Sequence, residues 1–260
     1  MGTGTTLKQA FDALMPQSKT EESSVSFDHI ELTEDEIEAA LTKAREEKYY
    51  KQKRIEYNQK LNQPFEVKVY SWQQMFEAFR AQYTIDNDNQ ALIENIAKYF
   101  AGETTTLNLN KGLLLMGGVG VGKTTLMHFF RFNQKYSYRI VSCRSVETEF
   151  STRGDEMIRH YSNNHIPAHG SNPFNQGSLG YCFDDLGTEA NGKHFGKDKN
   201  AMAEVILNRY DSGLDRSTTH VTTNLTAAEL KEQYGSRVTD RMKEMMNVVT
   251  FPTTSKSRRA

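Results

Sequence analysis

The amino-acid sequence predicts an α/β fold in which a parallel five-stranded sheet is flanked by helices. Five short apolar segments of strand length follow residue 110, and helical patterns separate them. Strands that alternate with helices in this way form a parallel sheet covered on both faces. The expected strands are residues 113–116, 138–143, 180–183, 220–223 and 248–251.

Length and composition set the outer limits of this prediction. The chain has 260 residues, a formal net charge of -1 and 37% hydrophobic residues, which suits one or two domains. The near-balance of charge argues against a highly basic nucleic-acid binder, although it leaves room for a local basic patch. Two cysteines, Cys143 and Cys182, are too few for a disulfide framework or a four-cysteine zinc site. No apolar run is long enough to cross a bilayer, so we expect a cytoplasmic protein without a membrane partner.

The region before the sheet is expected to be helical. Residues 1–30 are polar and predict a flexible tail, and residues 31–105 form the helical N-terminal region. Residues 33–36 read T-E-D-E, a capping box, with Ile37 and Leu41 at helical spacing behind it. This helix is either a solvated helix or one that docks a partner.

Two further helices are expected before the first strand. Ser71 and Gln74 form a second capping box, followed by an apolar stripe to Phe79. Another stripe covers residues 92–100, and Gly102 is placed to end it. We expect both helices to pack against the domain that follows, residues 106–255. Residues 160–180 are rich in Asn, Ser, Gly and Pro and predict a loop, while residues 256–260 form a basic tail.

A glycine-rich segment directly after the first strand carries the clearest chemical motif. Residues 117–124 read G-G-V-G-V-G-K-T and match the phosphate-binding P-loop, G-x-x-x-x-G-K-[ST]. Backbone N–H groups of such a loop surround a phosphate, the lysine reaches the β and γ phosphates, and the hydroxyl ligates Mg²⁺. A glycine-rich turn without a nucleotide is the alternative. The candidate phosphate-binding residues are Gly117, Gly118, Val119, Gly120, Val121, Gly122, Lys123, Thr124 and Thr125.

Two acidic residues end the third expected strand. Asp184 and Asp185 follow the apolar run Y-C-F, about 60 residues after the P-loop. A P-loop NTPase needs a carboxylate there to hold Mg²⁺, for which Asp184 is the candidate together with Thr124. Asp185 would orient or deprotonate the attacking water. An ordinary turn at a strand end is the alternative reading of the acidic pair.

Three motifs after the P-loop together resemble one family. Residues 184–189 read D-D-L-G-T-E, residues 222–225 read T-T-N-L, and residues 235–242 read G-S-R-V-T-D-R-M. Over residues 108–255 the chain resembles the DnaC/DnaI/IstB-like branch of the AAA+ ATPases, which contains replicative helicase loaders and transposition helpers. The resemblance implies an AAA+ type of P-loop fold that hydrolyses ATP with Mg²⁺.

The resemblance also assigns roles to single residues. Asn224 resembles the sensor 1 residue beside the γ-phosphate, and Arg237 resembles an arginine finger that acts on the nucleotide of a neighbouring subunit. Such a finger implies a homo-oligomer when ATP is bound; a surface arginine is the alternative. The family often has Asp-Glu where this chain has Asp184-Asp185, so either Asp185 or Glu189 handles the water. No C-terminal lid domain is expected.

The function expected from the resemblance is that of an ATP-hydrolysing DNA replication protein of the helicase-loader type. It would bind single-stranded DNA and contact a replicative DNA helicase through the N-terminal region. Two alternatives stay open: a transposition helper ATPase, whose partner is a transposase, and a monomeric P-loop phosphotransferase acting on a small molecule. The candidate DNA contacts are Lys135, Arg139, Arg144, Arg153 and Arg159, and for any single one of them a solvated charged face is the favoured alternative.

Overall fold

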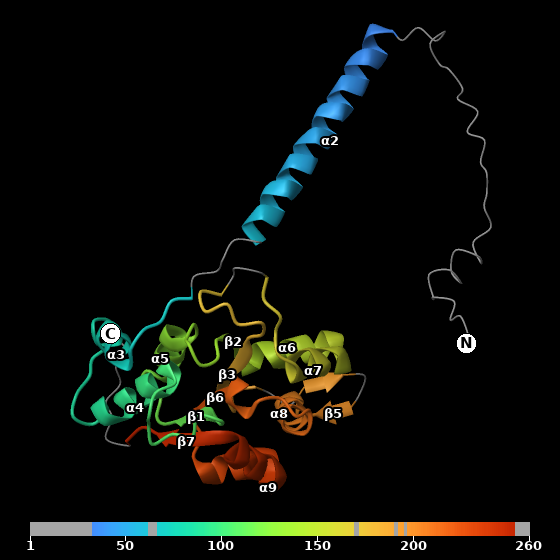
Figure 1. Cartoon of the computed structure of the whole chain (residues 1–260). Coiled ribbons are helices and arrows are strands. Elements are labelled where there is room, and N and C mark those ends of the chain that lie inside the picture. Colours follow the sequence, from blue (N-terminus) through green and yellow to red (C-terminus); the bar gives the residue numbers. More distant parts are fainter. Residues whose placement is uncertain (1–32, 62–66, 169–171, 190–191, 195–196, 253–260) are drawn as a thin grey trace, which may run out of the picture. The chain divides into compact units, whose positions relative to one another are not determined.

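The computed structural model describes residues 33–61, 67–168, 172–189, 192–194 and 197–252 (Figure 1). The backbone forms two units, Met1–Asn62 and Gln63–Ala260, and each is described by itself. The tails expected at 1–30 and 256–260 lie outside the described residues. The domain boundaries expected at residues 31, 106 and 255 stay predictions.

The described part of the first unit is a single long helix, α2 (Glu34–Leu61). It begins where the capping box predicts: the Thr33 N–H donates to the Glu36 carboxylate over 2.8 Å, and the Glu36 N–H donates to the Thr33 hydroxyl over 3.4 Å. Its apolar side chains Ile37 and Leu41 are 45% and 50% exposed. Capping and helix propensity, rather than burial, therefore define this helix.

The second unit contains the predicted parallel sheet. Its strands lie in the order β2-β3-β6-β1-β7, and every neighbouring pair is parallel (Figure 1). Numbered along the chain, this order is 2-3-4-1-5. The prediction of five parallel strands is confirmed by β1 (Gly112–Met116), β2 (Tyr138–Ser142), β3 (Gly180–Leu186), β6 (Thr219–Thr223) and β7 (Met246–Thr250).

Helices cover both faces of this sheet, and alternate residues of β1 point to opposite faces. Leu114 and Met116 belong to one hydrophobic core, with side chains of α6 (Cys143–Arg153), α7 (Asp155–Ser162), α8 (Ala201–Asp211) and α9 (Ala227–Met245). Leu113 and Leu115 belong to the other, with side chains of α3 (Trp72–Arg80), α4 (Gln90–Ala101) and α5 (Lys123–Phe130). The sheet is therefore the middle of three layers.

Helices α3 and α4 pack onto the sheet as their apolar stripes predict. The capping box of Ser71 and Gln74 is present at the start of α3, and Gly102, with a φ of 73°, ends α4. Phe79, Ile93 and Phe100 are fully buried in the second core. These two helices thus complete one face of the sheet.

The structure also differs from the sequence prediction at several places. Helix α7 extends into the expected loop, and His165 pairs with Leu179 across it in an isolated antiparallel bridge. Cys143 begins α6 instead of ending β2, because its side chain is buried in the first core. The hairpin of β4 (Gly192–His194) and β5 (Lys197–Lys199), and the short 3-10 helix η1 (Arg216–Thr218), had no sequence signal. None of the described helices is long and apolar enough to cross a bilayer.

A buried histidine lies within the central strand β6. His220 is fully buried, with the ring of Tyr138 at a centroid distance of 4.7 Å. Its Nδ1 accepts the Leu113 N–H over 3.1 Å, whereas Nε2 has no hydrogen-bond partner among the described residues. Burial, with a smaller contribution from the charge of Arg209, lowers the pKa of His220 to about 3. The ring is therefore neutral in the folded protein at pH 5 to 7.

We predict that His220 makes the fold acid-sensitive below pH 6.5. The unfolded chain takes up a proton at this residue near pH 6.5, and the folded chain does not until about pH 3. The contribution of His220 to the free energy of unfolding is therefore fully present above pH 6.5 and falls as the pH drops toward 3. Between pH 7 and pH 5 this single group should lower the free energy of unfolding by about 2 kcal/mol.

Urea unfolding at pH 7 and pH 5 tests this prediction. In His220→Asn, whose amide oxygen keeps an acceptor for Leu113, the loss of stability between the two pH values should be about 2 kcal/mol smaller than in the unchanged protein. His128→Asn, at an exposed position, is the control and should behave like the unchanged protein. An equal loss in both variants would contradict the prediction.

Candidate nucleotide site

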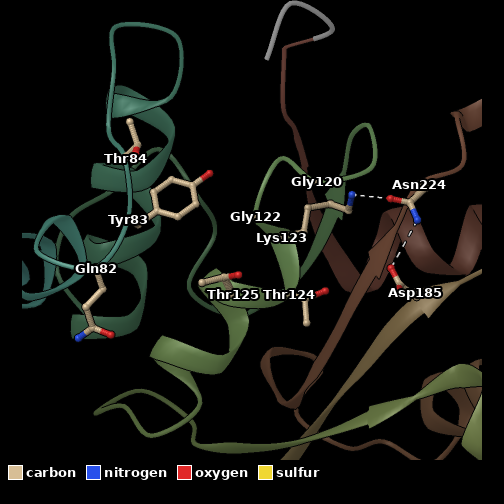
Figure 2. A pocket seen from close by; sticks show the side chains of 10 residues that line it. All are labelled: Gln82, Tyr83, Thr84, Gly120, Gly122, Lys123, Thr124, Thr125, Asp185 and Asn224. Atoms are coloured by element: carbon tan, nitrogen blue, oxygen red, sulfur yellow. Dashed lines mark hydrogen bonds between the residues drawn. The ribbon is translucent and has the colours of Figure 1, made fainter. Parts of the chain in front are cut away.

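The P-loop connects β1 to α5, as the motif predicts. Gly122 is the N-cap of α5 and has a φ of 92°, which favours glycine. A pocket opens here, and its walls come from three parts of the chain (Figure 2). The lining residues are Gly120, Gly122, Lys123, Thr124 and Thr125 of the P-loop segment, Asp185 and Asn224 at strand ends, and Gln82, Tyr83 and Thr84 after α3.

The Lys123 ammonium lies in a cradle of oxygen atoms. Its Nζ donates to the carbonyl oxygens of Gly117 and Gly118 over 2.8 and 2.9 Å, and to Oδ1 of Asn224 over 2.7 Å (Figure 2). The side chain is 4% exposed. All three of these acceptors are neutral oxygen atoms. A phosphate group fits such a charge better than neutral carbonyl oxygens do.

Thr124 and the buried residues Asp184 and Thr222 form a chain of polar groups beside the lysine. The Thr124 hydroxyl lies 3.0 and 3.1 Å from the two carboxylate oxygens of Asp184. The Thr222 hydroxyl donates to Asp184 over 2.6 Å and accepts the Asp185 N–H over 2.9 Å. Thr222 therefore fixes both members of the acidic pair.

This arrangement can hold Mg²⁺ only together with a ligand. A hydroxyl and one carboxylate are the oxygen donors that Mg²⁺ uses at nucleotide sites, where phosphates and water supply its remaining ligands. Within the described residues no group of three or more His, Cys, Asp or Glu side chains is placed to hold a metal ion. The residues present thus fit a magnesium ion that arrives with a phosphorylated molecule.

Asp185 has an unusual backbone conformation at the pocket. Its φ is 57°, one of two positive values at non-glycine residues among those described, and the pairing of β3 with β6 is irregular between Phe183 and Leu186. Irregularities of this kind re-aim side chains near active sites. The Asp185 carboxylate lines the pocket, and Nδ2 of Asn224 lies 3.5 Å from its Oδ1 (Figure 2).

Residues that sequence reasoning did not connect with the site form its third wall. Figure 2 shows Gln82, Tyr83 and Thr84 on the side of the P-loop opposite Asp185 and Asn224. The Tyr83 hydroxyl donates to the Val121 carbonyl oxygen. A Cβ on Gly122 would lie 2.3 Å from Cε2 of Tyr83, so the loop needs glycine there. These residues precede the motif by 33 to 35 positions, and no motif marks them.

Other predicted residues lie at the edge of the pocket or outside it. Val119 is 62% exposed, and Val121 is buried in the second core. Arg237, on α9, is exposed and is not among the residues that line the pocket. Its guanidinium has no hydrogen bond or ion pair within the described part of the chain. Arg241 instead pairs with Glu244 over 3.4 Å.

Glu189, considered from the sequence for the attacking water, is also outside the pocket lining. Its carboxylate accepts the Gly187 N–H over 2.9 Å and the Tyr234 hydroxyl, and the residue is buried. Of the two acids, Asp185 is the one that lines the pocket.

The strand order 2-3-4-1-5 and the placement of the P-loop after the first strand define a parallel α/β fold of the P-loop type. The sequence matches no protein-family model and no curated protein. Solved structures of similar fold include a crystal structure of the DnaC helicase loader (17% identity, TM-score 0.46, covering 66% of this chain and 94% of that one) and a crystal structure of DnaI (19%, 0.46, 69% and 89%). A third is AMPPCP-bound DnaA from Aquifex aeolicus (15%, 0.43, 68% and 51%).

We predict that Thr222→Val raises the Mg²⁺ concentration that nucleotide binding requires. The substitution keeps the shape of the side chain but removes the hydroxyl that holds Asp184, and lost partners of metal ligands typically weaken metal affinity about 10- to 100-fold. The measurement is a Mg²⁺ titration of the binding of a fluorescent ATP analogue. Thr223→Val is the matched control, because the Thr223 hydroxyl donates to the Leu186 carbonyl oxygen instead. An equal magnesium requirement in both variants would refute the role of Thr222.

Proposed function

We propose that this protein binds ATP with Mg²⁺ and hydrolyses it to ADP and phosphate, as an AAA+ ATPase of the helicase-loader type. The observation that carries the proposal is the convergence of Lys123, the Thr124–Asp184 pair, and Asp185 with Asn224 around one pocket. These are the groups that grip phosphates, hold a metal ion and handle a water molecule.

The residues divide the chemical work among themselves. Lys123 would exchange its carbonyl partners for the β and γ phosphate oxygens, and the glycine amides would surround the β-phosphate. The magnesium ion, held through Thr124 and Asp184, would neutralise charge on the phosphates. Asp185 would accept a proton from water while the water oxygen bonds to the γ-phosphorus, the bond to the β–γ bridging oxygen breaks and ADP leaves. Asn224, hydrogen-bonded to both Lys123 and Asp185, would fix their spacing.

Arg237 would complete the site of a neighbouring subunit. Its guanidinium is exposed, has no partner among the described residues, and does not line the pocket of its own chain. A guanidinium is always charged and its planar fork fits phosphate oxygens. Arginine fingers contribute about 10³- to 10⁵-fold to the rate. ATP would therefore bridge subunits in a homo-oligomer, and hydrolysis would loosen the contact.

The candidate contacts to single-stranded DNA differ in whether neighbouring carboxylates already neutralise their charge. Arg153 pairs with both Glu149 and Glu156 at 3.0 Å, so its charge is already neutralised. Arg139 instead lies 3.3 Å from Nδ1 of His165 and has no carboxylate partner in the described part of the chain. It shares a surface hollow with Arg131 and the partly exposed Phe132. Cations beside an aromatic ring are the groups that bind single strands.

Helix α2 would dock the protein partner. Its side chains, described except at residues 57, 60 and 61, are exposed apart from the half-buried Glu56, and they include Ile37, Leu41, Tyr49 and Tyr50. A long helix with exposed apolar side chains gains stability by packing against another protein. We propose a replicative DNA helicase as that partner, by resemblance to the helicase loaders.

We predict that two inactive variants restore activity when mixed. Lys123→Ala lacks a functional nucleotide pocket and Arg237→Ala lacks the finger, so each alone should lose most ATPase activity. An oligomer containing both has interfaces that join an intact pocket to an intact arginine. Steady-state phosphate release over a range of mixing ratios measures this.

The same assay distinguishes the oligomer from a monomeric phosphotransferase. For an oligomer, specific activity should fall on dilution. Constant specific activity on dilution together with full turnover of Arg237→Ala would overturn the trans arrangement.

We also predict that Arg139→Ala weakens binding of a fluorescent oligothymidine several-fold. Loss of one phosphate contact should reduce the slope of log K against log salt by about 0.7. Arg153→Ala is the matched control and should stay within about twofold of the unchanged protein, because two carboxylates already neutralise that arginine. Equal effects of the two substitutions would argue against Arg139 as a DNA contact.

A further inference from the structure

A buried hydrogen bond joins the acidic end of β3 to helix α9. The Tyr234 hydroxyl donates to Oε1 of Glu189, and both residues are 7% exposed. Glu189 is itself tied to the strand end, because its Oε2 accepts the Gly187 N–H over 2.9 Å. Between Asp185 and Glu189 the chain makes a tight turn, in which the Thr188 N–H and hydroxyl donate to the Asp185 carbonyl oxygen. The path from Asp185 to Tyr234 thus consists of a tight turn and two hydrogen bonds.

Helix α9 changes direction immediately after Tyr234. Gly235 has φ 80° and ψ 165°, a backbone conformation that interrupts the helix and that residues with a side chain rarely adopt. The Thr239 hydroxyl donates to the carbonyl oxygens of Gly235 and Ser236, which stabilises the start of the second half. Arg237 lies in the first turn of that half. Tyr234 is therefore the last side chain anchored in the interior before the arginine.

The surroundings of Glu189 make the donated bond important. Glu147, on α6, is also buried, and neither of its carboxylate oxygens has a hydrogen-bond partner within the described residues. Burial, and then the negative charge of Glu189, raise the pKa of Glu147. Without the tyrosine hydroxyl, Glu189 would face this second carboxyl group with only the Gly187 N–H as donor. A buried carboxylate that loses a donor tends to move or to change its charge.

We propose that Tyr234 and Glu189 are positioning residues, which tie the segment that carries Arg237 to the strand end that carries Asp184 and Asp185. The proposal rests on the proposed function, because it concerns the arginine given to a neighbouring subunit. Each subunit would set the position of its own finger through the acidic end of β3. A change at that strand end on ATP binding or hydrolysis would then reach the next subunit through the turn and the two hydrogen bonds of Glu189.

Complementation between variants provides the test. Tyr234→Phe keeps its own P-loop but should misplace Arg237. In mixtures it should therefore behave like Arg237→Ala. Alone, it should lose at least tenfold in kcat, with the affinity for a fluorescent ATP analogue unchanged within about twofold. Mixed with Lys123→Ala it should regain activity, and mixed with Arg237→Ala it should not. A residue that acts on its own pocket would give the opposite pattern.

The matched control is Tyr161→Phe. The Tyr161 hydroxyl donates to the Glu149 carboxylate over 2.8 Å, and the residue is buried to a similar degree. The control thus removes the same group from the same kind of bond, and it should leave kcat within about twofold. A further readout is ATP-dependent association in sedimentation, which Tyr234→Phe should weaken as Arg237→Ala does.

The outcomes distinguish failure of the trans arrangement of Arg237 from failure of the positioning role of Tyr234 and Glu189. If Lys123→Ala and Arg237→Ala fail to complement each other, the trans finger fails and this inference fails with it. If they complement but Tyr234→Phe keeps normal kcat, or complements Arg237→Ala, only the positioning role is overturned. If Tyr234→Phe does not fold, as urea unfolding would show, Glu189→Met is tested in its place. It keeps the side-chain length but lacks the acceptor, and the same complementation pattern is expected.

Discussion

The parallel pairing of β3, β6 and β1 as neighbours places the candidate site. Their carboxyl ends lie along one edge, so Asp184 and Asp185, Thr222 and Asn224, and the P-loop meet although up to 107 positions separate them along the chain. Two side-chain contacts then lock the edge: Lys123 to Asn224 at 2.7 Å and Thr222 to Asp184 at 2.6 Å. Both are charge-assisted hydrogen bonds with little access to water, where such bonds are strong.

The polar groups of this edge hold one another in place before any ligand arrives. Lys123 donates to the carbonyl oxygens of Gly117 and Gly118, and the Asp184 carboxylate accepts from two hydroxyls. The Asp184 carboxylate is thereby held in place in advance, which favours affinity and rate, whereas Lys123 would exchange hydrogen-bond partners when a phosphate binds. The positive φ of Asp185 departs from regular strand geometry, and it lies at the residue proposed to handle water.

Much of the fold and half of the site could be predicted because their signals are local in sequence. The capping boxes at Thr33 and Ser71 mark helix starts that the structure confirms, since a cap is formed within four residues. The five apolar strands and the P-loop are likewise contiguous. By contrast, Thr222 lies in the T-T-N-L motif without an assigned role, and its contacts to the acidic pair appear only when β6 pairs with β3. The hairpin of β4 and β5 has no periodic pattern long enough to predict.

The sequence by itself determined the parallel α/β architecture, the position of the P-loop motif between a strand and a helix, and the acidic pair at a strand end, because short-range pattern and spacing specify each of them. Only the tertiary structure decided that Gln82, Tyr83 and Thr84 close the pocket, that Glu189 bonds to Tyr234 instead of lining it, and that Arg153 is neutralised while Arg139 is not. These features depend on which side chains meet across elements distant in the chain. Packing of the two cores sets those meetings, and no local pattern records them.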